Sequence, residues 1–120
     1  MRAELTVECN GAVVIARLRG EPTVELLKEC QERVLSMARS RGTTKVLYDA
    51  LEMRPPPVDV PWAQRQLDES NDELQLRRAV VVPCTKLAYL ARLAFGDGDY
   101  RVFYDDMAPA VRWLDEATAA

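Results

Sequence analysis

The side-chain types present in this chain limit the chemistry it can perform. The 120 residues include no histidine, and the three cysteines, Cys9, Cys30 and Cys84, are widely spaced. Without histidine there is no Ser-His-Asp or Cys-His nucleophile, and zinc sites with histidine ligands are excluded. No Cys-x-x-Cys pair is present to build a cysteine-only site. Proton transfer would depend on carboxylates, lysine, tyrosine or cysteine, and we expect no catalytic residue, no metal site and no cofactor.

Four polar residues are candidates for a ligand-binding crevice. Asp49, Cys84, Thr85 and Asp105 lie at the expected carboxyl ends of parallel strands, where open α/β sheets bind ligands near helix N-termini. One hypothesis is a small anion held by Thr85 and backbone N–H groups. The alternative, which we favour, is that Thr85 and Asp105 cap helices and that Asp49 is a polar loop residue.

Two other kinds of chemistry are weighed at the same positions. Asp49 with Asp105 and Asp106 suggests a Mg²⁺ site. If the strands lie in sequential order, one intervening strand separates the backbones by roughly 9–10 Å, so capping is the better interpretation. Cys84 precedes an expected helix N-terminus, which can lower a thiol pKa. With no histidine or second cysteine beside it, we expect no redox or nucleophilic role.

Five segments are predicted to be the strands that position these residues. Residues 4–9 alternate between charged or polar and apolar side chains, as in a half-buried strand. Asn10-Gly11 is a strong hairpin signal, and residues 12–18 return as the second strand. Three short apolar runs, of the kind found in parallel strands, follow at Lys45–Asp49, Ala79–Val82 and Tyr100–Tyr104.

Four helices are predicted between and after these strands. The first begins after Thr23 as N-cap and stops at Gly42. Its expected apolar stripe is Val24, Leu27, Cys30, Val34, Met37 and Ala38. The second runs from about Asp59 to Leu74 and is acidic and least buried. The third follows Thr85. The last follows Asp105 or Asp106 and should face inward through Met107, Ala110, Val111, Leu114 and Ala117.

The order of these elements defines the fold class. A hairpin followed by three strand-helix units predicts an α/β fold with a five-stranded, mostly parallel sheet and four helices. The first strand is short and charged, which suits an antiparallel edge strand. The length of 120 residues is that of one domain, so residues 1–120 are expected to form it.

The third helix carries more apolar residues than one stripe needs. Its expected core residues are Leu87, Leu90, Ala91 and Ala94, and the residues left over are Ala88, Tyr89, Leu93 and Phe95. The final helix, through Trp113, would cover one flank. A two-fold homodimer through Tyr89, Leu93 and Phe95 would bury the rest. Deeper packing within one chain is the alternative. The acidic second helix is a poor interface because like charges would meet across the two-fold axis.

Composition limits the kinds of partner the protein can bind and indicates the cellular compartment in which it is expected. The net charge of −3 disfavours a nucleic-acid binder. No apolar run approaches the ~18 residues of a membrane span, and no signal peptide is recognisable. An odd number of dispersed cysteines argues against a disulfide framework. We therefore expect a cytoplasmic protein without a transmembrane segment.

Five groups of residues serve as landmarks along the chain: Arg17-Leu18-Arg19-Gly20 with Pro22-Thr23, Val46-Leu47-Tyr48-Asp49, Arg78-Ala79-Val80-Val81, Arg101-Val102-Phe103 and Ala110-Val111-Arg112-Trp113-Leu114. In this order they resemble the STAS-like family, the bacterial SpoIIAA-like (anti-anti-sigma-factor-like) proteins, and within it a STAS/CRAL-TRIO-like group of unknown role. The resemblance implies a β-α superhelix with helices mainly on one face. Regulatory members have a phosphorylatable Ser or Thr after the strand-end Asp, where this chain has Ala50, so phospho-switching is not expected.

The leading functional hypothesis is a non-enzymatic interaction or small-ligand-binding module, with a protein partner or a small anionic or apolar ligand. Two alternatives remain: a lipid or apolar-ligand binder, by resemblance to lipid-transfer relatives, and a small enzyme using carboxylate or cysteine chemistry in the strand-end crevice. A well-formed apolar pocket would favour the lipid binder, and converging titratable groups the enzyme. A flat apolar patch in a symmetric contact would favour the interaction module.

Overall fold

The computed structural model describes residues 3–55, 76–95 and 99–116. Within these ranges the chain forms β1 (Glu4–Asn10), β2 (Val13–Gly20), α1 (Val24–Arg41), β3 (Lys45–Met53), β4 (Arg77–Val82), α3 (Thr85–Phe95), β5 (Tyr100–Tyr104) and α4 (Met107–Glu116). The described part thus contains three of the four predicted helices. The predicted helix from Asp59 to Leu74 lies outside the described residues.

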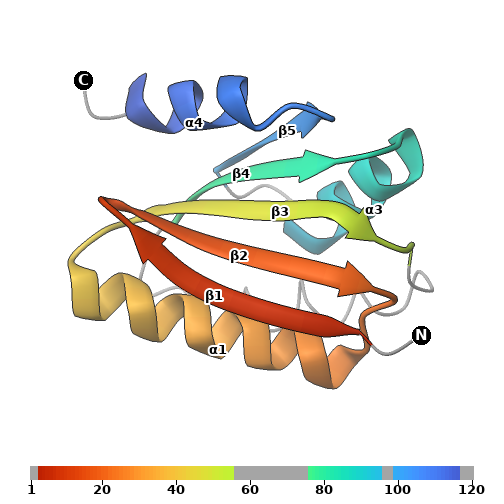
Figure 1. Ribbon diagram of the computed structural model, residues 1–120, viewed down its shortest axis with the longest axis horizontal. Coiled ribbons are helices and arrows are strands. Elements are labelled where there is room, and N and C mark those ends of the chain that lie inside the picture. The colour runs from red at the N-terminus through yellow and green to blue at the C-terminus, as the bar shows by residue number, and fades with distance from the viewer. Residues whose placement is uncertain (1–2, 56–75, 96–98, 117–120) are drawn as a thin grey trace.

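The five strands form one mixed sheet, as predicted. Their spatial order is β1-β2-β3-β4-β5, the same as their order in the chain. β1 is antiparallel to β2, and the other three pairs are parallel (Figure 1). The chain therefore crosses the sheet in one direction, from the β1 edge to the β5 edge. Each parallel pair is joined by a crossover connection, as parallel neighbours require.

The hairpin between β1 and β2 turns one residue later than predicted. Asn10 is the last residue of β1 and pairs with Val13, so Gly11 and Ala12 are the two central residues of the turn. Gly11 has φ 63°, and a glycine in the first central position is typical of type II′ hairpin turns. This turn sets the register in which Glu4 lies opposite Arg19 and Thr6 opposite Arg17.

β3 is longer than the sequence predicted, because it continues four residues beyond Asp49 to Met53. Its pairing with β4 ends where Asp49 meets Val81. Pairing with β2 continues, but the register shifts between Arg17 and Arg19, whose partners are Asp49 and Glu52. β3 therefore contains a bulge with one extra residue directly after Asp49.

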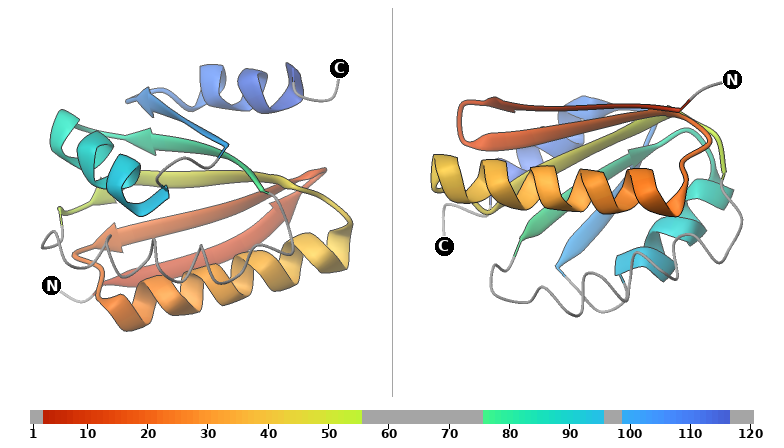
Figure 2. Two further views of the ribbon diagram at one scale, coloured as in Figure 1. Left: turned by 180° about the vertical axis from the view of Figure 1, so that it is seen from behind. Right: turned by 90° about the horizontal axis from the view of Figure 1, so that it is seen from below.

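Helices cover the two faces of the sheet unequally. α1 and α3 pack on one face, over a core that includes Val14, Val46 and Val80. α4 packs on the other face, over Leu47, Ala79 and Val81 (Figure 2). The resemblance implied helices mainly on one face, and two of the three described helices share a face.

α4 does not cover the flank of α3, and this corrects the prediction made for Trp113. The Trp113 ring lies 6.1 Å from the Phe103 ring on the opposite face of the sheet. The Arg77 guanidinium lies over Trp113, 3.6 Å from the ring centroid. Val111, predicted to face inward, is exposed, while Ala110 and Leu114 are buried as predicted. The predicted contact of Ala117 lies outside the described residues.

The ends of α1 are formed as the sequence predicted. The Thr23 hydroxyl accepts a hydrogen bond from the N–H of Leu26 at 3.1 Å. Gly42 adopts a left-handed conformation with φ 64° and closes the helix. The buried face includes the predicted Cys30, Val34 and Ala38, and also Gln31 and Leu35, which the predicted stripe omitted. No described helix is both long and apolar enough to cross a membrane.

Candidate functional site

The four predicted crevice residues do not form one site. Asp49 lies within β3, not at its end, on the face that carries Leu47 and Leu51. Its carboxylate turns toward β2 and binds Arg17. Cys84 and Thr85 follow β4 and lead into α3, which packs on the opposite face. Asp49 therefore lies on the α4 face of the sheet, whereas Cys84 and Thr85 lead into a helix on the α1 face.

Asp49 has a structural role that the sequence interpretation missed. Its Oδ2 accepts a hydrogen bond from Arg17 Nε at 2.8 Å, and its Oδ1 accepts one from the N–H of Leu51 at 3.1 Å. Leu51 lies in the bulge, where the regular strand pairing is interrupted. Asp49 thus stabilises the bulge and ties β3 to β2. The paired carboxylate raises the pKa of the Arg17 guanidinium above its ordinary value, first through the hydrogen bond and then through charge attraction.

The residues after β4 and β5 serve helix ends: the cap of α3 differs from the predicted one, and the cap of α4 is one of the two predicted. α3 begins at Thr85, so Cys84 holds the capping position, and its carbonyl accepts from the N–H of Ala88 at 3.2 Å. The prediction that Thr85 is the N-cap of this helix is therefore wrong. Asp106 caps α4, because its Oδ1 accepts from the N–H of Ala108 at 3.1 Å.

Asp105 forms the turn between β5 and α4, and its role there depends on its backbone. Its N–H donates to the carbonyl of Val82 at 3.0 Å, and it adopts a left-handed φ of 58°. This conformation turns the chain from β5 into α4. Among the described residues, no three cysteine, aspartate or glutamate side chains are grouped so that they could hold a metal ion.

The three cysteines are free and lie in different surroundings. Cys30 is buried in α1, and burial raises the pKa of its thiol to about 12. The thiol is therefore protonated at neutral pH and behaves as a small apolar core residue. Cys9 is half-buried on β1, and Cys84 is exposed before α3.

The predicted dimer face on α3 is smaller than the sequence indicated. Ala88, expected off the core stripe, is fully buried, and this corrects the prediction. Leu93 is half-buried against the α1–α3 core, while Tyr89 is 55% exposed. The Phe95 side chain lies outside the described residues. The dimer stays a prediction, and of its two residues whose side chains the structure describes, Tyr89 is the more accessible.

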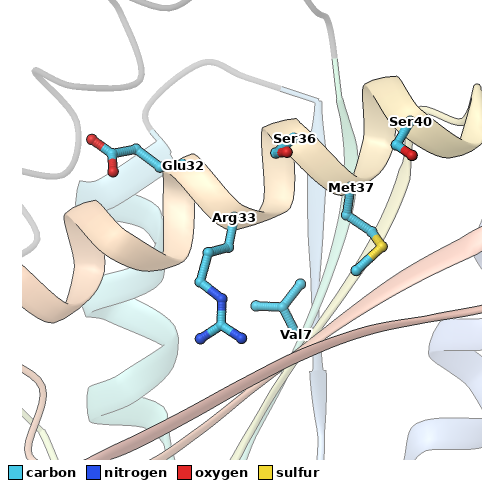
Figure 3. Close-up of a pocket in the computed structure, with 6 residues that line it drawn as sticks. All are labelled: Val7, Glu32, Arg33, Ser36, Met37 and Ser40. Carbon is cyan, nitrogen blue, oxygen red and sulfur yellow. The ribbon is translucent and has the colours of Figure 1, made fainter.

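A hollow in the described part of the chain lies elsewhere, between α1 and the edge strand β1. This groove has a volume of about 420 Å³ and is lined by Val7, Glu32, Arg33, Ser36, Met37 and Ser40. Arg33 and Met37 reach from α1 toward β1, Val7 points back toward the helix, and Glu32 points away (Figure 3). The groove forms because α1 packs across β1 and β2 at the edge of the sheet.

Sequence reasoning did not identify this groove. Val7 was predicted on the apolar side of a half-buried strand and Met37 in the apolar stripe of the first helix, and both are half-buried residues that pack against the core. Ser36 follows Arg33 by three residues and Ser40 follows Ser36 by four, which places the three residues on one side of the helix. That spacing was the available signal, but it does not show which strand the helix crosses.

Comparisons with known proteins identify the fold. No family model matches the chain, and no curated protein matches it. An uncharacterized protein of the DUF3478 family with a SpoIIAA-like fold, from Shewanella loihica PV-4, matches with a TM-score of 0.61 and 19% identity over 93% of each chain. The anti-sigma factor antagonist SpoIIAA in its unphosphorylated form matches with a TM-score of 0.63 and 13% identity, over 93% of this chain and 98% of that one. This chain therefore has the STAS-like, SpoIIAA-like fold that its sequence resemblance implied.

Proposed function

We propose that this protein is a non-enzymatic interaction module that binds another protein in the groove between α1 and β1. The observation that carries the proposal is the position of the groove. It lies beside the terminal strand of the sheet, where both a helix face and a strand edge are available to a partner. One protein with the same fold is named an anti-sigma factor antagonist, and an anti-sigma factor is itself a protein.

The lining of the groove supports a protein partner over a lipid or another apolar ligand. Four of its six lining residues are polar or charged, namely Glu32, Arg33, Ser36 and Ser40. Val7 and Met37 are its apolar residues. Sites for small apolar ligands are enclosed and mostly apolar, whereas protein interfaces combine a small apolar centre with a polar rim.

The arrangement of the crevice residues supports a binding role over an enzymatic one. Asp49 is engaged by Arg17 and Leu51, and Asp106 is engaged by the first turn of α4. Ala50 has no hydroxyl group to accept a phosphate and is buried within β3, so we expect no phosphate to be transferred to the position after Asp49. The free cysteines support a reducing compartment, and we propose the bacterial cytoplasm.

A random peptide library displayed on phage tests the proposal without a known partner. The library is panned on the unaltered protein and on Ser36→Arg, which places a long charged side chain into the groove from an exposed helix position. Val111→Arg, at an exposed position on α4, is the matched control because it adds the same charge on the opposite face.

The expected result is a set of peptides that bind the unaltered protein and Val111→Arg but not Ser36→Arg. Such peptides would identify the groove as a peptide-binding surface. If no peptide is enriched, or if every enriched peptide binds Ser36→Arg equally well, the proposal is wrong.

A further inference from the structure

We infer that the groove binds an extended segment of another protein with alternating basic and apolar residues, which adds to β1 as a further antiparallel or parallel strand. This inference rests on the proposed function and specifies its binding mode and partner chemistry. Three features of the β1 edge carry it: the direction of its backbone groups, the groove on one face, and the acidic side chains on the other.

The backbone of β1 offers hydrogen bonds along its outer edge. β1 is the terminal strand of the sheet in the described part of the chain. In the two-residue turn, Asn10 and Val13 form a hydrogen-bonded pair, and such pairs alternate along an antiparallel ladder. Leu5, Val7 and Cys9 therefore direct their N–H and C=O groups away from β2. A strand added there would find a regular set of donors and acceptors.

The α1 face of this edge selects an apolar side chain. The side chains of Leu5, Val7 and Cys9 lie on that face and pack against the α1 core. The groove beside Val7 follows α1 from Arg33 to Ser40, a length of about 10 Å, or roughly three residues of an extended strand. One or two side chains of the added strand would therefore contact Val7 and Met37.

The opposite face of the same edge selects basic side chains. Glu4 and Glu8 are exposed on the α4 face of β1. The arginines beside them on β2 are bound by acids of β3, because Arg17 pairs with Asp49 and Arg19 with Glu52. Side chains of a neighbouring strand would lie about 5 Å from Glu4 and Glu8. Lysine or arginine would be attracted there, and acidic residues would be repelled.

Charge also decides against a second copy of this chain as the occupant. Pairing β1 with the β1 of a second copy would place Glu4 and Glu8 of both chains on the same face of the extended sheet. Like charges across strands are destabilising, and charged residues on edge strands oppose self-pairing. A basic segment of another protein has the complementary charge.

The test uses two peptides of identical composition. One is acetyl-Lys-Val-Lys-Val-Lys-Val-Lys-amide, whose seven residues match the length of β1, and the other carries the same residues as a lysine block followed by a valine block. Binding is measured by fluorescence anisotropy with the unaltered protein and with the double variant Glu4→Lys/Glu8→Lys. Glu21→Lys/Glu116→Lys, at exposed positions that neither belong to β1 nor line the groove, is the control with the same net charge.

The inference predicts that the alternating peptide binds more tightly than the block peptide. The β1 double variant should weaken its binding by about tenfold, because two attractive cross-strand pairs become repulsive. The control variant should bind as the unaltered protein does. A third peptide, in which glutamate replaces each lysine of the alternating sequence, should bind the β1 double variant more tightly than the lysine peptide does.

Other outcomes separate this inference from the proposed function. Groove-dependent peptides from the phage library that lack the alternation, or equal effects of the two double variants, would overturn strand addition and leave the proposed function standing. The absence of any groove-dependent peptide would overturn both. Self-association that is changed by Glu4→Lys/Glu8→Lys would replace the basic partner with a second copy of the chain.

Discussion

Replacing Asp49 tests the role assigned to this residue in the sheet. Asp49→Ala removes the acceptor for Arg17 Nε and for the N–H of Leu51. The Arg17 side chain is 39% exposed, so solvent screens that pair, and its loss should cost about 0.5–1 kcal/mol. Leaving the N–H of Leu51 without its partner in the bulge should cost about 1–2 kcal/mol. The expected loss of unfolding free energy is therefore about 2 kcal/mol.

Urea denaturation followed by circular dichroism measures this loss. Asp49→Asn should lose less, about 1 kcal/mol, because its amide oxygen can still accept from Leu51. Glu52→Ala is the control, since the Arg19–Glu52 pair joins side chains that are 52% and 63% exposed, and its loss should stay below about 0.5 kcal/mol. If Asp49→Ala costs no more than Glu52→Ala, then Asp49 does not support the bulge and the reasoning is refuted.

Three further predictions follow from single sites. Unfolding exposes the Cys30 thiol, whose pKa then falls from about 12 toward 9.0. The unfolded state therefore loses a proton first, and the free energy of unfolding should fall by about 1.4 kcal/mol per pH unit between pH 9.0 and about 12. Cys30→Ala should lack this slope in urea titrations, and an unchanged slope would contradict the prediction. Gly42→Ala should cost about 1 kcal/mol because φ is 64° there, and an unchanged urea midpoint would contradict this. A dimer through Tyr89, Leu93 and Phe95 predicts sedimentation as a dimer at micromolar concentration that Tyr89→Glu disrupts; a monomer would contradict it.

Local signals were sufficient to predict most elements of the fold. Thr23 and Gly42 determine the ends of α1 through hydrogen bonding and φ, and both are recognisable from their side chains alone. The parallel direction of β2 to β5 follows from the alternation of strands and helices, because parallel neighbours need crossovers. These features depend on a few neighbouring residues, so the sequence predicts them directly.

The candidate site depended on contacts between distant segments. Asp49 resembled a strand-end residue because the bulge that extends β3 depends on pairing with Arg17, 32 positions away in the chain. Trp113 was assigned to α3 because periodicity does not specify which face of the sheet a helix covers. The groove at Val7 arises from the path of α1 across β1, and no motif records that path.

Amide hydrogen exchange along β1 tests the central claim most directly. The alternating lysine-valine peptide is added at saturating concentration, and exchange is followed by NMR at each residue of β1. Strand addition predicts slower exchange at Leu5, Val7 and Cys9, whose N–H groups face outward, with little change at Thr6 and Glu8, which already bond to β2. Unchanged exchange at Val7, or slower exchange confined to α1, would contradict the claim that partners bind by extending the sheet.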